Sequence, residues 1–405
     1  MASEPVDVAD TRNTRARIAV AALFLTNGAL FANLLPRLPE IKTDLAMSNA
    51  AYGAAVASFS AGALLAGLAA AALIRRFTSA RVALVTTVGL AVLILLAGVA
   101  PAPLLLAAAL LGAGACDAIT DVAQNVNGLR LQRDYGRSII NSLHAVWAVG
   151  AIIGGSMGAA AIALSIPRAV HLGVAAVLFC GVVGLCYRWL LHGPDHDDHP
   201  SAGLPDGHAV GARVYLVLLA LVVIAIAGIA VEDAGSSWAT LYLRDSLGAP
   251  GQIAALGYVA QVGSMFVGRM AGDRLVDRFG ERAVLRVGGL IAAAGMGAAL
   301  AFPSVPGSIA GFAAAGFGVA TVVPAAMRAA DELPGLRPGT GLTALTWLMR
   351  LGSLGAPLAV GVVADATSLR LGLLSVPIAG LTLVLLAGVL SARKRSPLDR
   401  APLSG

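Results

Sequence analysis

GDRLVDRFGER, residues 272–282, is a short charged stretch between two long apolar runs. Part of it recurs earlier in the chain, because IRRFTSARV at 74–82 aligns with VDRFGERAV at 276–284, a spacing of 202 residues. Glycines recur at nearly the same spacing: Gly112-x-Gly114 matches Gly316-x-Gly318 after 204 residues, and Gly150 matches Gly352 after 202. Repetition at one fixed period indicates an internal repeat. We therefore predict two equivalent halves in parallel orientation, with a solute path between them.

The composition requires a membrane around these halves. Of 405 residues, 58% are hydrophobic and 12% are charged, whereas a soluble domain has about 25% charged residues. A soluble fold of this length could not bury so much apolar surface in one core. The net charge of +6 must then be interpreted by its position relative to the bilayer, and we expect no nucleic-acid partner.

Twelve stretches are long and apolar enough to cross a bilayer, for which a helix needs about 20 residues. They are 18–36, 50–74, 82–100, 103–129, 139–164, 168–191, 214–241, 251–272, 283–302, 307–328, 340–364 and 370–391. The longest polar interruption falls between the sixth and the seventh. The predicted organisation is a cytoplasmic tail (1–17), a six-helix bundle (18–191), a cytoplasmic linker (192–212), a second six-helix bundle (213–391) and a cytoplasmic tail (392–405).

Loop charges predict the orientation of these spans. If both termini are cytoplasmic, 22 of the 28 Lys and Arg residues lie on the inner side. Five lie on the outer side, and the remaining one, Arg350, lies inside an apolar span. Such an excess of inner cations is what the positive-inside rule describes.

The stretch at 272–282 resembles the signature loop of the major facilitator superfamily, which joins the second and third helices of a half. The first copy departs from it, since Arg75 and Thr78 stand where the loop's acidic residue and glycine would be. The resemblance covers essentially the whole chain. It implies an all-α integral membrane protein with twelve transmembrane helices in two pseudo-symmetric six-helix bundles, the major facilitator fold. It further implies a monomer without a cofactor, in which helices 1, 4, 7 and 10 line the solute path.

Three shorter stretches are similar to a bacterial branch near the fucose-permease-like transporters. They are DVAQN at 121–125, GRS at 136–138 with SxHAxW at 142–147, and WAxLYLRD at 238–245. Members of this branch largely lack assigned substrates. The similarity therefore implies that the protein lies in the bacterial cytoplasmic (inner) membrane, but it implies no particular solute.

Four polar side chains lie at spacings that place them on one face of the fourth span: Asp117, Asp121, Gln124 and Asn125. Ionisable groups inside a membrane are costly and are functional candidates by default. Asp117 is a candidate for binding solute or a proton, or it caps a neighbouring helix. Asp121 is a candidate proton carrier. Alternatively, Asp121 and Asn125 hold this helix to the next one as a gating clamp, through Asn141 or His144.

The fifth span adds His144 and Trp147, three residues apart on one face. A histidine titrates near neutral pH and is a candidate for carrying a coupling proton. The alternative is a histidine that only forms hydrogen bonds between helices. Trp147 is a candidate for stacking on a solute ring, or it fills space against the next helix.

The seventh span carries two adjacent acids, Glu232 and Asp233, within an apolar run. Adjacent residues cannot share one helical face, so we expect one to face the solute path and the other a neighbouring helix or water. Both are candidates for proton coupling; the alternative is an acid of the outer vestibule that caps a broken helix at Gly235-Ser236-Ser237. Trp238 is a candidate for solute contact at the outer gate or for anchoring at the membrane interface.

Arg350 is the most informative single residue, because its span contains no other charge before Asp365. A guanidinium cannot lose its proton there and needs an anion. That anion is either an acidic side chain, for which Asp117, Asp233 and Glu232 are the candidates, or an anionic solute. Gln261 and Asn27, near the middle of their spans, are further candidates for hydrogen bonds to a polar solute.

The inner loops give a gating prediction. Asp277, close to Arg278 and Arg282, is expected to form an inner latch that breaks as the halves rock. HDDH at 196–199 contains metal-ligand residue types, but a loop rich in Pro and Gly offers no fixed geometry, so we expect no metal.

Together these features predict a secondary active transporter. The solute is predicted to be a small polar or anionic organic molecule, moved by alternating access and driven by protons or another ion. The first alternative is a proton-coupled exporter of drugs or toxic metabolites, although Gly150-x-x-x-Gly154 lacks the proline expected of that group. The second is a membrane sensor that binds its ligand without transporting it. No nucleophile–base set or metal cluster indicates an enzyme.

Overall fold

The computed structural model describes residues 6–135, 139–193, 212–334, 336 and 340–390 and is all-helical in that part. Twelve helical segments are long and apolar enough to cross a membrane, which confirms the predicted fold class. The first half comprises α1 (Val6–Leu34) with η1 (Leu35–Arg37) and α2 (Leu38–Asp44), then α3 (Asn49–Phe77), α4 (Ser79–Gly98), α5 (Pro103–Tyr135), α6 (Ile140–Ala163) and α7 (Arg168–Tyr187). The second half comprises α8 (Ala212–Leu241) with η2 (Tyr242–Ser246), α9 (Gly251–Phe279), α10 (Glu281–Ala301), α11 (Val305–Val319), α12 (Val322–Asp331), α13 (Thr340–Ala366), α14 (Leu369–Gly372), α15 (Ser375–Leu386) and η3 (Ala387–Val389).

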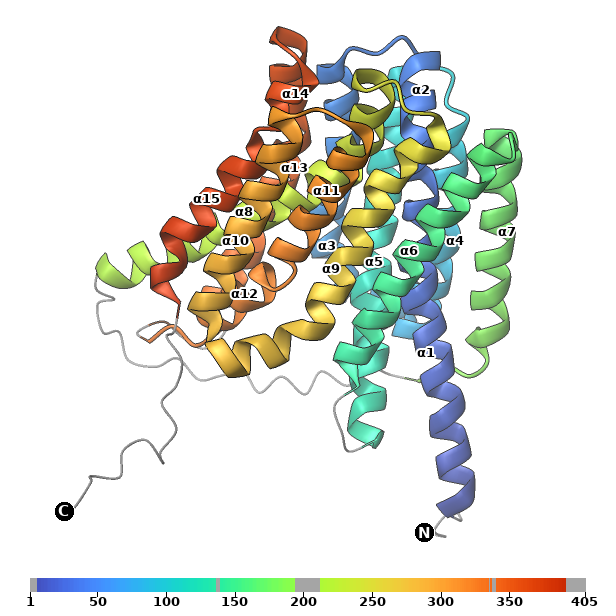
Figure 1. Cartoon of the computed structure of the whole chain (residues 1–405). Coiled ribbons are helices and arrows are strands. Elements are labelled where there is room, and N and C mark those ends of the chain that lie inside the picture. The colour runs from blue at the N-terminus through green and yellow to red at the C-terminus, as the bar shows by residue number, and fades with distance from the viewer. Residues whose placement is uncertain (1–5, 136–138, 194–211, 335, 337–339, 391–405) are drawn as a thin grey trace, which may run out of the picture.

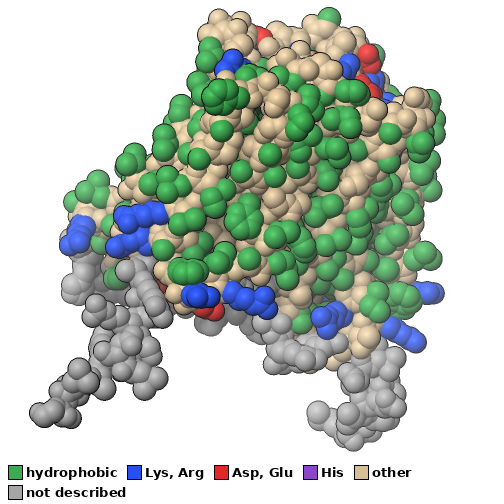
Figure 2. Space-filling view, in the orientation of Figure 1, with side chains coloured by type: hydrophobic (Ala, Val, Ile, Leu, Met, Phe, Trp, Pro, Cys, Tyr) green, Lys and Arg blue, Asp and Glu red, His purple; other side chains and the backbone are tan. Residues whose placement is uncertain are grey.

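The helices cross the molecule in alternating directions (Figure 1). We call the side on which α1 begins and α15 ends the terminal face, and the side that carries α2 and α14 the far face. Between the two faces the surface is a belt of hydrophobic side chains, and many Lys and Arg side chains gather at the terminal edge (Figure 2). Leu104, Phe302 and Leu385 are 79–80% exposed. Side chains of this kind need lipid around them.

The two halves are built on the same pattern, and one offset relates them throughout. Thr78, between α3 and α4, has φ 75° and ψ 150°, and Gly280, between α9 and α10, has φ 81° and ψ 154°. A Cβ on Gly114 would meet the backbone of Phe59, and one on Gly316 would meet the backbone of Gln261. Both pairs are 202 residues apart. The predicted alignment of Gly112 with Gly316, which are 204 residues apart, is therefore wrong, because Gly316 corresponds to Gly114.

Two predicted spans differ from the helices that form. The tenth span breaks at Ala320 and Thr321, between α11 and α12. Pro324 causes the break, because it has no N–H to donate to the carbonyl of Ala320 four residues before it. The first helix already begins at Val6 rather than after a tail of 17 residues. Of the predicted linker, residues 194–211 lie outside the described residues.

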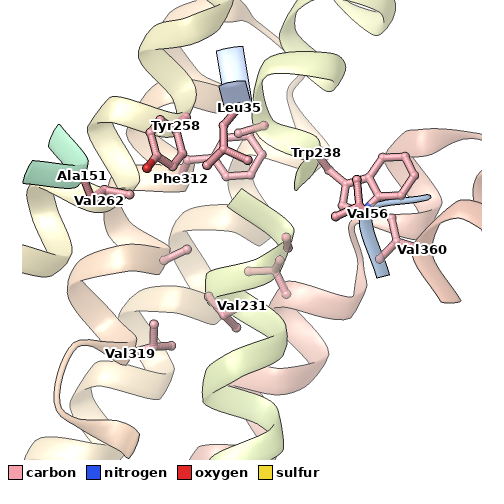
Figure 3. Packing of buried hydrophobic residues seen from close by; sticks show 14 of the residues in the cluster. Leu35, Val56, Ala151, Val231, Trp238, Tyr258, Val262, Phe312, Val319 and Val360 are labelled. Atoms are coloured by element: carbon pink, nitrogen blue, oxygen red, sulfur yellow. The ribbon is translucent and has the colours of Figure 1, made fainter. Parts of the chain in front are cut away.

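Contacts between the halves gather at the far face, where α3 meets α13 and α6 meets α9. Small residues permit the close approach: a Cβ on Gly53 would collide with the backbone of Pro357, and one on Gly361 with that of Asn49. Figure 3 shows Trp238 of α8 beside Val56 of α3 and Val360 of α13. We call this contact region the far-face seal.

Two polar contacts close the far-face seal. The Tyr52 hydroxyl donates to the Ser237 carbonyl at 2.6 Å. The two carboxylate oxygens of Asp365, at the end of α13, accept from the backbone N–H groups of Asn49 and Ala50 at 2.8 Å each. These N–H groups belong to the first turn of α3, which has no intrahelical acceptors for them. A carboxylate of the second half thus caps a helix of the first.

At the terminal face, Arg282 and Arg328 make polar contacts within their own half. Arg282 donates to the carbonyls of Gly388 and Leu390 at the end of η3, within the second half. Arg328 of α12 pairs with Glu281 of α10 at 3.2 Å. Asp277 is exposed. The predicted latch is therefore not closed in this conformation, and Arg282 instead ties two helices of its own half together.

Candidate functional site

A cavity of about 240 Å³ lies between the halves, next to the far-face seal. Its walls come from α1 and α3 of the first half and from α8 and α13 of the second. They are formed by Phe31, Val56, Phe59, Ser60, Ala63, Asp233, Ser236, Ser237, Arg350, Ser353 and Pro357. The first and seventh predicted spans, which are α1 and α8, line the cavity as the family resemblance implied. The second and eleventh spans, α3 and α13, complete it in place of the fourth and tenth spans.

Arg350 places a positive charge in the wall of this cavity. It lies ten residues into α13, about 15 Å along the helix axis. One guanidinium nitrogen donates to the Ala63 carbonyl of α3 at 3.4 Å. In the described part of the chain, no carboxylate oxygen lies within 4.0 Å of the guanidinium. An arginine has five N–H donors, so most of its donor capacity is left for another partner.

Asp233 supplies a carboxylate to the same cavity. Its Oδ2 accepts from the Ser353 hydroxyl at 2.9 Å, which links α8 to α13. Ser353 lies three residues after Arg350 and therefore on the same face of α13. Pro357 has no N–H to donate to the carbonyl of Ser353, so this backbone acceptor loses its intrahelical partner beside the cavity.

Glu232, next to Asp233, faces a neighbouring helix instead. Its Oε2 lies 3.6 Å from Nη2 of Arg269 on α9. Arg269 Nε donates to the Ala320 carbonyl at 3.4 Å, the carbonyl that Pro324 leaves without a helical donor. Arg269 thus joins α8, α9 and the break in the tenth span. This role of Arg269 was not predicted, because its position in the sequence places it among the cations counted for the inner loops.

A second polar cluster lies within the first half, around Asn27 of α1. Asn27 is 3% exposed, and its Nδ2 donates to Asp117 Oδ1 of α5 at 2.7 Å. Its Oδ1 accepts from Trp147 Nε1 of α6 at 2.9 Å and from Gln124 Nε2 at 3.5 Å. Three helices therefore meet at one amide. Asn27 and Trp147 hold this cluster together and do not line the cavity described above.

Asp121 lies one turn from Asp117 and is held by its own helix. Its Oδ1 accepts from Gln124 Nε2 and Asn125 Nδ2, both at 3.1 Å. His144 of α6 is exposed and lies within electrostatic reach of Asp121 and of Arg269. His144, the clamp partner predicted for Asp121, thus lies nearby, whereas the hydrogen bonds of Asp121 are formed within α5.

Arg350 connects the two clusters electrostatically. Its charge acts on Asp117 and Asp121 across the interface between the halves. The acidic partner predicted for Arg350 is therefore present in the first half at long range, without a direct ion pair.

Two predicted solute ligands are structural in this conformation. Trp238 is 0% exposed and packs edge-to-face on Tyr52, with ring centroids 5.0 Å apart. Gln261 is 1% exposed and donates to the carbonyls of Val231 and Glu232. Gly235 makes room for it, because a Cβ there would overlap the Gln261 amide. Both side chains are buried within the protein, and neither lines the cavity.

The cavity also contains an aromatic wall that the sequence analysis did not single out. Phe31 of α1 and Phe59 of α3 stack with ring centroids 4.1 Å apart and planes 18° apart. An aromatic residue in an apolar span carries no signal of its own. The 202-residue offset could have indicated these two, since it pairs Phe31 with Asp233 and Phe59 with Gln261.

Within the described ranges, no group of three or more His, Cys, Asp or Glu side chains could hold a metal ion. The HDDH stretch at 196–199 and the GRS stretch at 136–138 lie outside the described residues.

The chain is similar in sequence to a known protein family and to several bacterial membrane proteins. The sequence model of the Major Facilitator Superfamily matches residues 20–275. An uncharacterised transporter of Sinorhizobium fredii, y4wD, is 32% identical over 92% of this chain and 97% of its own length. The membrane protein MosC of Rhizobium meliloti is 29% identical over 93% of this chain and 90% of its own. These relatives do not test the narrower similarity to the fucose-permease-like branch, which stays a prediction.

Solved structures share the fold at low identity. The nucleoside transporter NupG superposes with a TM-score of 0.68 at 14% identity, over 92% of this chain and 96% of NupG. A bacterial homologue of the human lysosomal transporter Spinster, in an inward-facing and occupied conformation, gives a TM-score of 0.67 at 14% identity, over 96% of this chain and 97% of the homologue. At this identity the likeness shows the arrangement of helices alone.

Proposed function

Since this chain belongs to the major facilitator superfamily and is a membrane transporter rather than an enzyme, we propose that it moves a small polar or anionic organic solute by proton-coupled alternating access. The two halves rock about the cavity between them. The membrane is the bacterial cytoplasmic (inner) membrane, and the protein works as a monomer.

One observation carries this proposal: Arg350 lines the cavity between the halves without an ion pair within the described residues. A charge at membrane depth costs about 2.5–3.5 kcal/mol on insertion scales. An arginine kept there with free donors fits the binding of a carboxylate or phosphate oxygen of a solute.

The coupling ion enters through Asp117 and Asp121. These carboxylates compete with an anionic solute for the charge of Arg350. Protonation removes that competition, so proton and solute bind together and cross together. Asp233, Glu232 and His144 are the further candidates for the proton, because they lie in or next to the same space.

The terminal face is the cytoplasmic one in this proposal. The support is the excess of Arg and Lys on the loops at that side, in line with the positive-inside rule. The far-face seal then closes the outer side, and the conformation described here opens inward. A cysteine in place of Thr78 is expected to react with a membrane-impermeant thiol reagent from the cytoplasmic side alone.

The test is uptake into liposomes, with and without a pH gradient, for a panel of small organic anions. Arg350→Gln is expected to lower uptake by about tenfold to a hundredfold, the value of one hydrogen bond to a charged group. Arg286→Gln is the matched control, since Arg286 is exposed on α10. Normal flux through a correctly inserted Arg350→Gln variant would rule out the central anion site.

The alternatives of drug exporter and sensor are less well supported. A cavity of about 240 Å³ is smaller than the roughly 300–1,000 Å³ typical of drug-sized ligands. A sensor would bind an anion in the same assay and show no flux.

A further inference from the structure

Resting on the proposed function, we propose that the solute is a small carboxylate with a flat ring, held between the aromatic wall (Phe31 and Phe59) and Arg350. The shape of the cavity, the arrangement of its walls and its polar groups all bear on this.

The cavity has two chemically different sides. Phe31 and Asp233 are equivalent positions of the two halves, 202 residues apart, and both line it. The first half therefore offers stacked rings where the second half offers a carboxylate. A solute that is polar all round leaves the rings without a partner, and one that is apolar all round leaves Arg350 without an anion.

The aromatic wall fits a ring better than a chain. The Phe31 and Phe59 rings stack face to face, with centroids 4.1 Å apart and planes 18° apart, so the outer face of the stack is what they offer to a further ring. Both residues are only partly buried. A third ring stacks on such a surface in the offset geometry that aromatic groups prefer. Val56 and Pro357 extend the apolar lining.

Two serine hydroxyls of the cavity are already used by the protein. The Ser353 hydroxyl is used by Asp233, and the Ser236 hydroxyl by the Asp233 carbonyl. Arg350 retains most of its donors and matches the two oxygens of a carboxylate. The cavity, of about 240 Å³, has room for one ring with one carboxylate.

The experiment measures binding of three probes to the purified full-length protein: benzoate, its neutral isostere benzamide, and lactate, an anion without a ring. Benzoate is expected to bind at least about tenfold more tightly than either of the others. Phe59→Leu is expected to weaken benzoate by about twofold to tenfold, the range measured for aromatic pairs, and to leave lactate unchanged. Phe59→Tyr keeps the ring and is expected to retain benzoate binding.

Phe302→Leu is the matched control, because Phe302 lies 79% exposed on the outer surface; it is expected to bind benzoate normally. Equal, Arg350-dependent binding of lactate and benzoate, unaffected by Phe59→Leu, would overturn the ring requirement and leave the anion site standing. If neither anion binds, or if Arg350→Gln binds both normally, the proposed function fails and the ring inference fails with it.

Discussion

Asp117 accepts a hydrogen bond from the amide of Asn27 and lies within electrostatic reach of Arg350. In the proposed cycle, the negative charge of Asp117 partly neutralises the positive charge of Arg350 while no solute is bound. Asp117→Asn copies the protonated form and keeps the oxygen that accepts from Asn27. We expect this variant to insert normally and to bind an anionic solute roughly fivefold more tightly, since one competing charge is removed.

The decisive measurement for Asp117→Asn is the response of flux to a pH gradient. We expect the imposed gradient to have no effect on uptake, because the coupling proton has lost its carrier. Asp134→Asn, at the exposed end of the same helix, should keep the wild-type response. An unchanged pH response in Asp117→Asn would move the proton to Asp121, Asp233, Glu232 or His144.

The residues of the site differ in how far the sequence could reveal them. Arg350 and Asp233 were found because an ionisable group in an apolar span is costly. Gln261 was predicted as a solute ligand because it is a polar group near the middle of its span, but such a group can also be satisfied by nearby backbone, as Gln261 is. That outcome depends on packing between helices, which periodicity along one helix does not contain.

At the scale of the element, the turn between the second and third helices of each half sets a backbone requirement. Thr78 and Gly280 share a region of φ and ψ that only glycine occupies readily. Thr78 forms no side-chain cap with α4, so its side chain brings strain without a hydrogen bond in return. The charged loop that revealed the repeat also marks this strained point.

The two turns give a matched pair of substitutions. Thr78→Gly is expected to stabilise the protein by about 1 kcal/mol, the relief of strain less the added freedom of glycine when unfolded. Gly280→Thr is expected to destabilise it by about 1–3 kcal/mol. Thermal unfolding of the purified variants gives the comparison. A Thr78→Gly variant that unfolds at a lower temperature would show that the turn does not require glycine.

The break in the tenth span shows why element boundaries were harder to predict than element number. Pro324 in the sequence signals a disturbed helix, yet a proline is tolerated in membrane helices when a neighbour satisfies the freed carbonyl. Here the neighbour is Arg269, from a helix more than 50 residues away in sequence, which reaches the Ala320 carbonyl. A single helix could not have indicated that partner.

At the scale of the whole molecule, composition, loop charges and the repeat were enough to predict the fold. They depend on quantities summed over many residues, such as the 58% hydrophobic content, so errors at single positions cancel. The relation between the halves is different. It depends on a few contacts at the far-face seal, among them the Tyr52 hydroxyl on Ser237, and the sequence gives no measure of which of two arrangements is the more stable.

Asp365 is the part of the far-face seal whose effect on that balance can be isolated. Its carboxylate joins the halves through the first turn of α3, where a negative charge is favoured by the helix dipole. Asp365→Asn keeps the size of the side chain but loses the charge and one acceptor. We expect the equilibrium to move roughly twofold to fivefold toward the state open at the far face, given the usual strength of such exposed contacts.

The shift can be measured by the distance between labels on the far-face ends of α3 and α13. Asp44→Asn is the control, because Asp44 also lies on the far face but pairs with Arg168 of its own half, at 2.9 Å. Removing that pair leaves the contact between the halves intact, so the label distance should stay as in the wild type. Equal effects of the two variants would mean that far-face charge in general, and not the cap on α3, sets the balance between the two states.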